Sequence, residues 1–173
     1  MALNLSSAEV LGADALTQFE EQVERAGLSL GSVEIEITEE VLLDRVSDRT
    51  LKHLVDLRDR GARLVLDDFG TGHSGLSQLL RLPLNGLKLD KRFVQRLGVD
   101  PRAGEIVRAT LSLAHGLGLD VVAEGIETEE QAATLRTLGC GVAQGFLFAR
   151  PMPPDALRAW LKQIASRVRC GVL

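Results

Sequence analysis

Residues 64–75 read LVLDDFGTGHSG, an apolar run followed by two adjacent aspartates and by three glycines in the spacing G-x-G-x-x-G. After a strand and before a helix, that glycine spacing is typical of a dinucleotide-binding loop, in which backbone amides approach a pyrophosphate. Asp67 and Asp68 favour another interpretation, because paired carboxylates at a strand end repel a phosphate and attract a cation. The stretch therefore poses a choice between a phosphate-binding loop and a metal site.

Short apolar or β-branched runs alternate with helical patterns along the rest of the chain. Strands are expected at residues 2–6, 32–38, 62–67, 86–90, 119–124 and 141–148. Helices are expected at residues 14–26, 48–60, 74–82, 104–117, 128–138 and 155–168. Glycine just past a helix, as at Gly27 and Gly61, is a common helix stop. Strands that alternate with helices predict parallel βα units, and so an α/β fold in one domain over residues 1–173.

The expected strands carry polar side chains on one face. In residues 86–90, Leu87 and Leu89 share one face and Lys88 lies on the other. A doubly wound sheet buries both faces under helices and needs nearly all-apolar strands, whereas a (β/α) barrel gathers polar side chains at the C-terminal mouth of its interior. The pattern therefore predicts a TIM-like barrel. Each expected strand supplies one polar residue near its C-terminal end: Asn4, Glu36, Asp67, Lys88, Glu124 and Gln144.

These polar residues indicate metal-assisted chemistry. Carboxylates and an amide oxygen are ligands that suit Mg²⁺ or Mn²⁺, and the adjacent Asp67 and Asp68 could each touch a different ion. Two such ions are the usual arrangement for attack on a phosphodiester. Lys88 would add a fixed positive charge near the water or the phosphate. Glu124 would be the general base, with a plain metal ligand or a partner of Lys88 as the alternative roles.

Composition excludes several other classes of function. The net charge of −4 gives no basic footprint for a long nucleic acid. The chain has no apolar run long enough to span a membrane, and its first residues do not resemble a signal peptide, so a cytoplasmic protein is expected. Cys140 and Cys170 form no C-x-x-C motif, and the three histidines have no metal-ligand spacing.

Six motifs together resemble the EAL-domain family, the phosphodiesterases of bacterial cyclic di-GMP signalling. They match the family in order and spacing from near one end of the chain to the other. The resemblance implies a TIM-like barrel and Mg²⁺- or Mn²⁺-dependent hydrolysis of one phosphodiester of cyclic di-GMP to the linear dinucleotide. The motifs are NLS (4–6), EITE (36–39), DDFGTG (67–72), KLD (88–90), VVAEGIET (121–128) and QGFLFARPM (144–152).

The resemblance also implies roles for individual residues. Asn4, Glu36 and Asp67 look like metal ligands, with Asp68 near the second ion. Lys88 resembles the lysine that holds the second metal's water, and Glu124 resembles the proposed base. Substrate-binding or supporting roles are implied for Gln144, Glu127, Asp90 and Glu39, and Glu39 resembles the residue that anchors the loop after the paired aspartates. His73 and Gly75 stand where the family more often has Tyr and Ser.

The chain departs from the family in lacking the Glu-Ala-Leu motif, whose glutamate is a metal ligand in the family and is followed by a substrate-contacting arginine. The motifs begin in the third strand of the family pattern, so about six of the eight strands of a barrel are expected. An open barrel exposes strand edges, and a homodimer that covers them is a secondary expectation. The sequence leaves open a fragment, a truncated reading frame and a degenerate domain.

Three functions are therefore weighed. The first is a cyclic di-GMP phosphodiesterase domain that is active when the missing N-terminal part is supplied. The second is a catalytically inactive module that binds cyclic di-GMP or a protein. The third is a Rossmann-type nucleotide-binding protein, for which Asp90 has about the right spacing from Gly70. Pro83 cuts short the helix that the third interpretation needs, and Asp67 and Asp68 repel a pyrophosphate, so the third is disfavoured.

Overall fold

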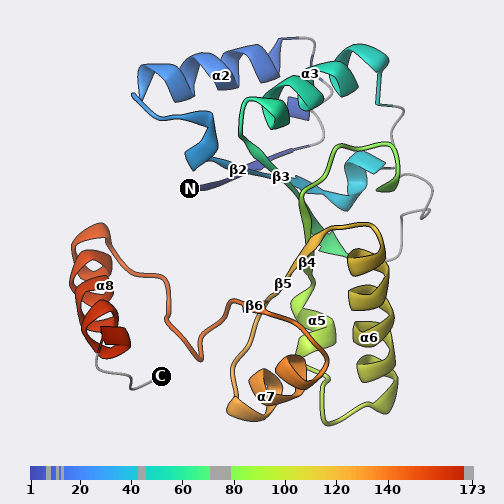
Figure 1. The fold of residues 1–173 in the computed structure, drawn as a ribbon, viewed down its shortest axis with the longest axis vertical. Coiled ribbons are helices and arrows are strands. Elements are labelled where there is room, and N and C mark those ends of the chain that lie inside the picture. The colour runs from blue at the N-terminus through green and yellow to red at the C-terminus, as the bar shows by residue number, and fades with distance from the viewer. Residues whose placement is uncertain (7–8, 11, 13, 43–45, 71–78, 170–173) are drawn as a thin grey trace.

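The computed structural model describes residues 1–6, 9–10, 12, 14–42, 46–70 and 79–169, and shows one parallel sheet with helices beside it, while the last helix stands apart from the sheet (Figure 1). Within these residues the sheet has six strands in the order β1-β2-β3-β4-β5-β6, and every neighbouring pair is parallel. The strands are β1 (Ala2–Leu5), β2 (Glu34–Thr38), β3 (Arg63–Phe69), β4 (Gly86–Leu89), β5 (Asp120–Ala123) and β6 (Val142–Ala143).

The strand order confirms the barrel-like interpretation. Each strand pairs with the one before it in the sequence, as in the winding of a (β/α) barrel. A Rossmann sheet would instead reverse its strand order at a switch point near the first strand. β1 and β6 are the two edges of the sheet over the described residues, so the α/β fold is a partial TIM-like barrel with six strands.

Six α-helices and two short 3₁₀ helices connect or follow the strands in the described part of the chain. The α-helices are α2 (Ala15–Arg25), α3 (Asp48–Asp59), α5 (Lys91–Val94), α6 (Pro101–Gly116), α7 (Glu129–Thr137) and α8 (Pro154–Arg169). The 3₁₀ helices are η1 (Leu30–Ser32) and η2 (Glu39–Leu42). None of the helices within the described ranges has the length and apolar character that a bilayer crossing requires.

The sequence patterns explain most helix boundaries. The side chain of Ser47 accepts a hydrogen bond from Thr50 N at the start of α3, and Thr128 forms a capping box with Gln131 at the start of α7. Gly27 and Gly61 take the left-handed conformation expected of helix stops, with φ of 68° and 105°.

Three expected elements differ clearly from the structure, and one helix was not expected. The sixth strand is limited to Val142–Ala143 instead of 141–148, because the chain turns back at Gly145, whose carbonyl accepts bonds from Phe148 N and Ala149 N. The second strand begins at Glu34, because η1 takes up the residues before it. Helix α6 begins at Pro101, where Asp100 provides the N-cap. The helix α5 was missed, and residues 74–78 of the helix expected at 74–82 lie outside the described residues.

Alternation along the strands separates an apolar layer from a polar one. Ile35 and Ile37 on β2 are 0% exposed, as are Leu64 and Leu66 on β3. They belong to the hydrophobic core between the sheet and its helices. The residues between them point to the opposite face of the sheet, which is the interior of the partial barrel. The apolar core therefore fixes which side chains meet on the inner face.

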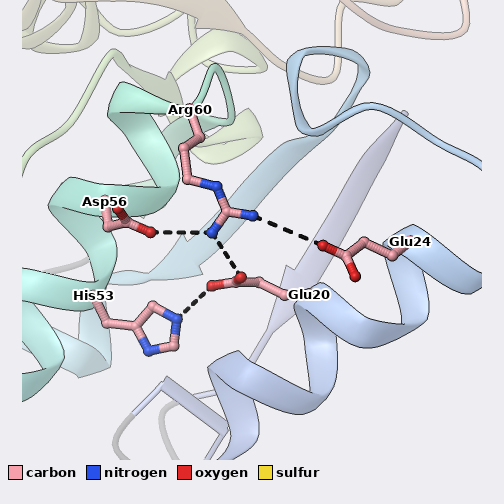
Figure 2. A network of polar contacts seen from close by, with 5 residues as sticks. All are labelled: Glu20, Glu24, His53, Asp56 and Arg60. Carbon is pink, nitrogen blue, oxygen red and sulfur yellow. Dashed lines mark hydrogen bonds and ion pairs between the residues drawn. The ribbon is translucent and has the colours of Figure 1, made fainter.

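A network of charged side chains joins α2 to α3 on the outside of the sheet (Figure 2). Glu20 Oε2 accepts a hydrogen bond of 2.7 Å from Arg60 Nη1, and Glu20 Oε1 is bonded to His53 Nε2. Arg60 also contacts Asp56 at 3.0 Å and Glu24 at 4.0 Å. Burial by itself would raise the pKa of Glu20, but the hydrogen bonds from Arg60 and His53 outweigh it and the pKa is lowered.

We expect Glu20→Gln to lower the free energy of unfolding by about 1–2 kcal/mol at pH 7, because it removes a carboxylate that is only 16% exposed and bonded to two donors. A lowered pKa contributes stability above the unfolded value of about 4.3, and that contribution is lost as the pH falls through the lower folded value. Urea unfolding from pH 7 to pH 3 should therefore show the two proteins converging in acid. Glu21→Gln is the control, because its pair with Arg25 is 53% exposed on the glutamate side and should matter little. Equal losses in both variants would contradict the expectation.

Candidate active site

Four inward-facing side chains meet near the C-terminal ends of β2, β3, β4 and β5. Lys88 Nζ lies 3.0 Å from Glu36 Oε2, 3.4 Å from Asp67 Oδ1 and 2.7 Å from Glu124 Oε1. We call this group the Lys88 centre. Lys88 and Glu36 are buried, with side chains 8% and 9% exposed. The structure thus brings together four of the six strand-end residues that the sequence singled out.

The charge of the Lys88 centre is set by three carboxylates around one ammonium. Burial would lower the pKa of Lys88, but hydrogen bonds to Glu124 and Glu36 and the charge of Asp67 raise it above its ordinary value. Lys88 is therefore protonated at neutral pH and serves as a fixed positive charge. Its single charge leaves the three carboxylates with an excess of negative charge, which favours binding of a further cation.

Asp68 and Asp90 form a pair of carboxyl groups beside the Lys88 centre. Asp68 has φ of 57°, a left-handed conformation that Asp tolerates better than most residues, and its N–H donates to Asp67 Oδ1 at 2.9 Å. Burial, the charge of Asp67 and a hydrogen bond with Asp90 raise the pKa of Asp68. Burial opposes the lowering of the pKa of Asp90, but hydrogen bonds from Arg92 prevail.

Arg92, which the sequence analysis missed, forms an ion pair with Asp90. Its backbone N–H and its Nε donate to Asp90 Oδ1 at 2.7 and 3.0 Å. The hydrogen bond with Asp90 raises the pKa of Arg92, with smaller contributions from the charges of Asp68 and Glu39. Glu39 is 4% exposed. The loop that it was predicted to anchor, including His73 and Gly75, lies outside the described residues.

The remaining predicted residues lie around the Lys88 centre. Asn4 on β1 pairs in register with Glu36 on β2, so both are on the inner face. Gln144 follows β6 and lines two cavities, one of about 420 Å³ with Glu36 and Lys88 and one of about 550 Å³ with Glu124 and Glu127. Glu127 is exposed on the loop before α7. The roles of all these residues in binding or catalysis stay predictions.

A second ion-pair group lies closer to the N-terminal ends of the strands and was also missed. Arg63 on β3 contacts Glu34 on β2 at 3.3 Å and Asp120 on β5 at 2.7 Å. To reach Asp120 it crosses β4 at Gly86, which stands in register with Asp120 and has no side chain to block it. The alternation of Arg63, Val65 and Asp67 could have placed Arg63 on the inner face. Its partner on β5, Asp120, could not be predicted without the strand order.

The oxygen donors here belong to the ligand types that suit Mg²⁺ or Mn²⁺, because they are carboxylates with a nearby amide. As arranged, the described residues contain no group of three or more His, Cys, Asp or Glu side chains placed to hold a metal ion. The geometry agrees with this, because the ammonium of Lys88 lies among Glu36, Asp67 and Glu124. It also shows the pairing of Glu124 with Lys88 that was one of the alternative roles of that glutamate.

We expect Lys88→Met to lower the free energy of unfolding by about 3 kcal/mol in EDTA, because it leaves buried carboxylates facing one another without a counter-charge. Adding Glu36→Gln to this variant should recover part of the loss, since it removes one of the facing charges. Urea unfolding of the single and double variants measures both effects. Lys52→Met, at an exposed position on α3, is the control. No loss in Lys88→Met, or no recovery in the double variant, would show that the ion pairs do not hold these strand ends together.

The chain has close similarity to known proteins. It is 40% identical over 162 residues to the cyclic di-GMP phosphodiesterase NbdA of Pseudomonas aeruginosa, an alignment that covers 94% of this chain and 21% of that protein. The PaMucR phosphodiesterase in complex with c-di-GMP superimposes with a TM-score of 0.82 and 39% identity, over 90% of this chain and 63% of that one.

A manganese and cyclic di-GMP complex of Klebsiella pneumoniae BlrP1 superimposes with a TM-score of 0.77 and 36% identity, over 87% of this chain and 38% of that one. The chain spans about a fifth of the length of the curated relatives that it matches first, with 21%, 21% and 20% of each covered. The model of the EAL domain matches residues 1–151. With the sequential parallel strands and the strand-end carboxylates, this match shows that the chain belongs to the EAL domain family.

Proposed function

We propose that this chain supplies the strand-end carboxylates and the lysine of a cyclic di-GMP phosphodiesterase, which hydrolyses one phosphodiester to the linear dinucleotide. The observation that carries the proposal is the Lys88 centre, where three carboxylates at the ends of three strands surround one ammonium. The similarity to NbdA and to PaMucR supports the choice of substrate. The sequence has no Glu-Ala-Leu motif, so the proposal requires that this glutamate come from another segment or chain.

In this proposal, Asn4, Glu36, Asp67 and Asp68 provide oxygen ligands for two Mg²⁺ or Mn²⁺ ions. When bound, such ions would polarise the phosphate and lower the pKa of the attacking water. The manganese complex of BlrP1 supports the choice of metal. The excess negative charge of the Lys88 centre is the property of this chain that favours uptake of the ions.

The protein groups have separate tasks in the reaction. Glu124, with its side chain 19% exposed, accepts the proton of the attacking water. Lys88 holds Glu124 in place through their contact of 2.7 Å and stays protonated throughout, so it is not a competing base. Gln144 and Glu127 line the cavity next to Glu124, where they contact the substrate. Asp90 and Glu39 keep Arg92 and Asp68 in position, Asp90 through hydrogen bonds to both and Glu39 through its charge beside Arg92.

A second candidate function is a catalytically inactive module that binds cyclic di-GMP or a protein partner. It is favoured by the position of the Lys88 ammonium, which occupies the space between three of the predicted ligands and catalytic groups. An EAL-like site held together by its own lysine could bind the dinucleotide without taking up ions. Turnover distinguishes the two functions.

With Mn²⁺ or Mg²⁺, and with the Glu-Ala-Leu glutamate supplied by a further segment or chain, the full chain is expected to convert cyclic di-GMP to the linear dinucleotide, and Glu124→Gln should slow this step by roughly a hundredfold or more. Chromatographic separation of the products measures turnover, and calorimetry measures binding. Glu105→Gln, at an exposed position on α6, is the control and should turn over like the wild type. Binding without turnover would support the inactive module. A chain that neither binds nor hydrolyses cyclic di-GMP when the Glu-Ala-Leu glutamate is supplied would overturn both functions.

We also propose that the chain forms a homodimer. β1 and β6 leave strand edges uncovered by other described strands, and Val142 on β6 is 55% exposed. Light scattering after size-exclusion chromatography should give about twice the mass of one chain, and Val142→Lys on the edge strand should shift it toward the monomer. A monomeric wild type at micromolar concentration would contradict the proposal.

A further inference from the structure

The strand β3 has a β-bulge at Asp67 and Asp68. Two residues of β3 lie there between register partners that enclose only one residue, Lys88, on β4. A regular strand would point two adjacent side chains to opposite faces of the sheet. The bulge instead leaves both aspartates opposite Lys88. The flanking pairs are Leu66 with Leu87 and Phe69 with Leu89.

The side chains around the bulge show to which side it turns the aspartates. Leu66 and Phe69 are 0% and 8% exposed, and both belong to the hydrophobic core on the outer face. Between them, Asp67 belongs to the Lys88 centre on the inner face. Asp68 has φ of 57°, and its side chain is hydrogen-bonded to Asp90, just beyond the end of β4. The bulge therefore brings the second aspartate to the same strand ends as the first.

Phe93 on α5 packs on the residue that follows the bulged end of β3. This residue is Gly70, which has φ of 98°. A Cβ atom at Gly70 would lie 2.8 Å from Phe93 Cε2 and 3.1 Å from Cζ, so the ring leaves no room for a side chain there. Phe93 is half-buried and also packs against the hydrophobic core. The ring thus joins the end of β3 to the core through α5.

The helix α5 also holds the hydrogen-bond partner of the bulge. Asp90 directly precedes α5, and its carbonyl accepts a bond of 3.1 Å from Phe93 N, while its Oδ1 accepts a bond of 2.7 Å from Arg92 N. Two contacts therefore link α5 to the bulge, one from Asp90 to Asp68 and one from Phe93 to Gly70. A non-glycine residue in the left-handed conformation is unfavourable by itself, so surrounding contacts have to maintain it.

We propose that Phe93 is a positioning residue for the proposed reaction, because its ring holds Gly70 and so maintains the bulge that brings Asp67 and Asp68 together. The inference rests on the proposed function, in which these two aspartates are ion ligands. Phe93 touches neither the ions nor the dinucleotide. It acts on the position of the second aspartate relative to the first, and the orientation of ligands strongly affects the affinity of a metal site.

The test compares the full chain with Phe93→Leu, in which leucine keeps an apolar contact with the core but lacks the ring atoms that lie against Gly70. Amide exchange measured by NMR in EDTA should be roughly tenfold faster at Asp68 and Phe69, and within about twofold of the wild type at Ile37 on β2. Calorimetric titration with Mn²⁺ should show an affinity roughly tenfold lower than that of the wild type, because a metal ligand has lost its support.

Leu113→Ala separates this effect from a general loss of stability. Leu113 on α6 is also half-buried and packs against the hydrophobic core. Its substitution should lower the free energy of unfolding, measured in urea, but leave both the amide exchange at Asp68 and the Mn²⁺ affinity close to their wild-type values.

Gly70→Ala tests the same contact from the other side, also if Phe93→Leu does not fold. Its matched control is Gly139→Ala, because Gly139 has φ of 91° but no atom of the described residues within 4 Å of an added Cβ. Gly70→Ala should weaken Mn²⁺ binding by roughly tenfold, and Gly139→Ala by less than about twofold. In the Phe93→Leu background, Gly70→Ala should weaken binding by no more than about threefold, because the ring atoms that it would strike are gone.

The outcomes separate this inference from the proposed function. Wild-type exchange at Asp68 in Phe93→Leu, or the same changes in Leu113→Ala, would overturn the role of Phe93 and leave the phosphodiesterase proposal standing. Faster exchange with wild-type Mn²⁺ affinity would also overturn it, because the ring would then hold the bulge without positioning a ligand. If the wild-type chain binds no Mn²⁺, the proposed uptake of ions by this chain is overturned, and faster exchange in Phe93→Leu would still support Phe93 as the residue that holds the bulge.

Discussion

The contact of one lysine with three carboxylates is the interaction on which the inner face of this sheet depends. Glu36 and Asp67 lie on β2 and β3 and Glu124 directly follows β5, and without the Lys88 ammonium their mutual repulsion would push those strand ends apart. Such a group does not stabilise the fold as an apolar cluster would, because the desolvation of buried charges offsets much of their attraction. The stability comes instead from the outer face, where Ile35, Leu64 and Leu87 are 0% exposed.

The sequence was sufficient to predict the fold class and the main polar group because both follow from local alternation. A strand that alternates Leu87, Lys88 and Leu89 has an apolar and a polar face whatever its neighbours are. Parallel strands in sequential order then bring the C-terminal ends together at one edge. Lys88 therefore meets Glu36, Asp67 and Glu124 because side chains alternate along each strand and because the strands follow one another in the sheet. No sequence motif that links these residues in pairs was needed to predict the contact.

Other features depended on contacts between distant segments and could not be predicted from local patterns. The apolar run at 141–148 reads as a strand, but the close approach of Gly145 to Ile126 turns the chain after two residues. Arg63 reaches Asp120 only because Gly86 lies between them in the sheet. The Arg150 guanidinium lies 4.5 Å from the centre of the Phe146 ring because of the same turn, so this contact could not be predicted while residues 141–148 were expected to be extended.

The sequential strand order also determines how local unfolding would affect the site. Each strand bonds only to its neighbours in the sequence, so fraying begins at the edges β1 and β6 and reaches the middle last. The Lys88 centre uses only β2 to β5, whereas Asn4 and Gln144 lie on or next to the edge strands. The charge pattern at the centre is therefore the persistent part of the site. Asn4 and Gln144 are lost from the site whenever their edge strands fray. Any segment or chain that covers an edge would therefore stabilise the positions of these two residues before it affected the Lys88 centre.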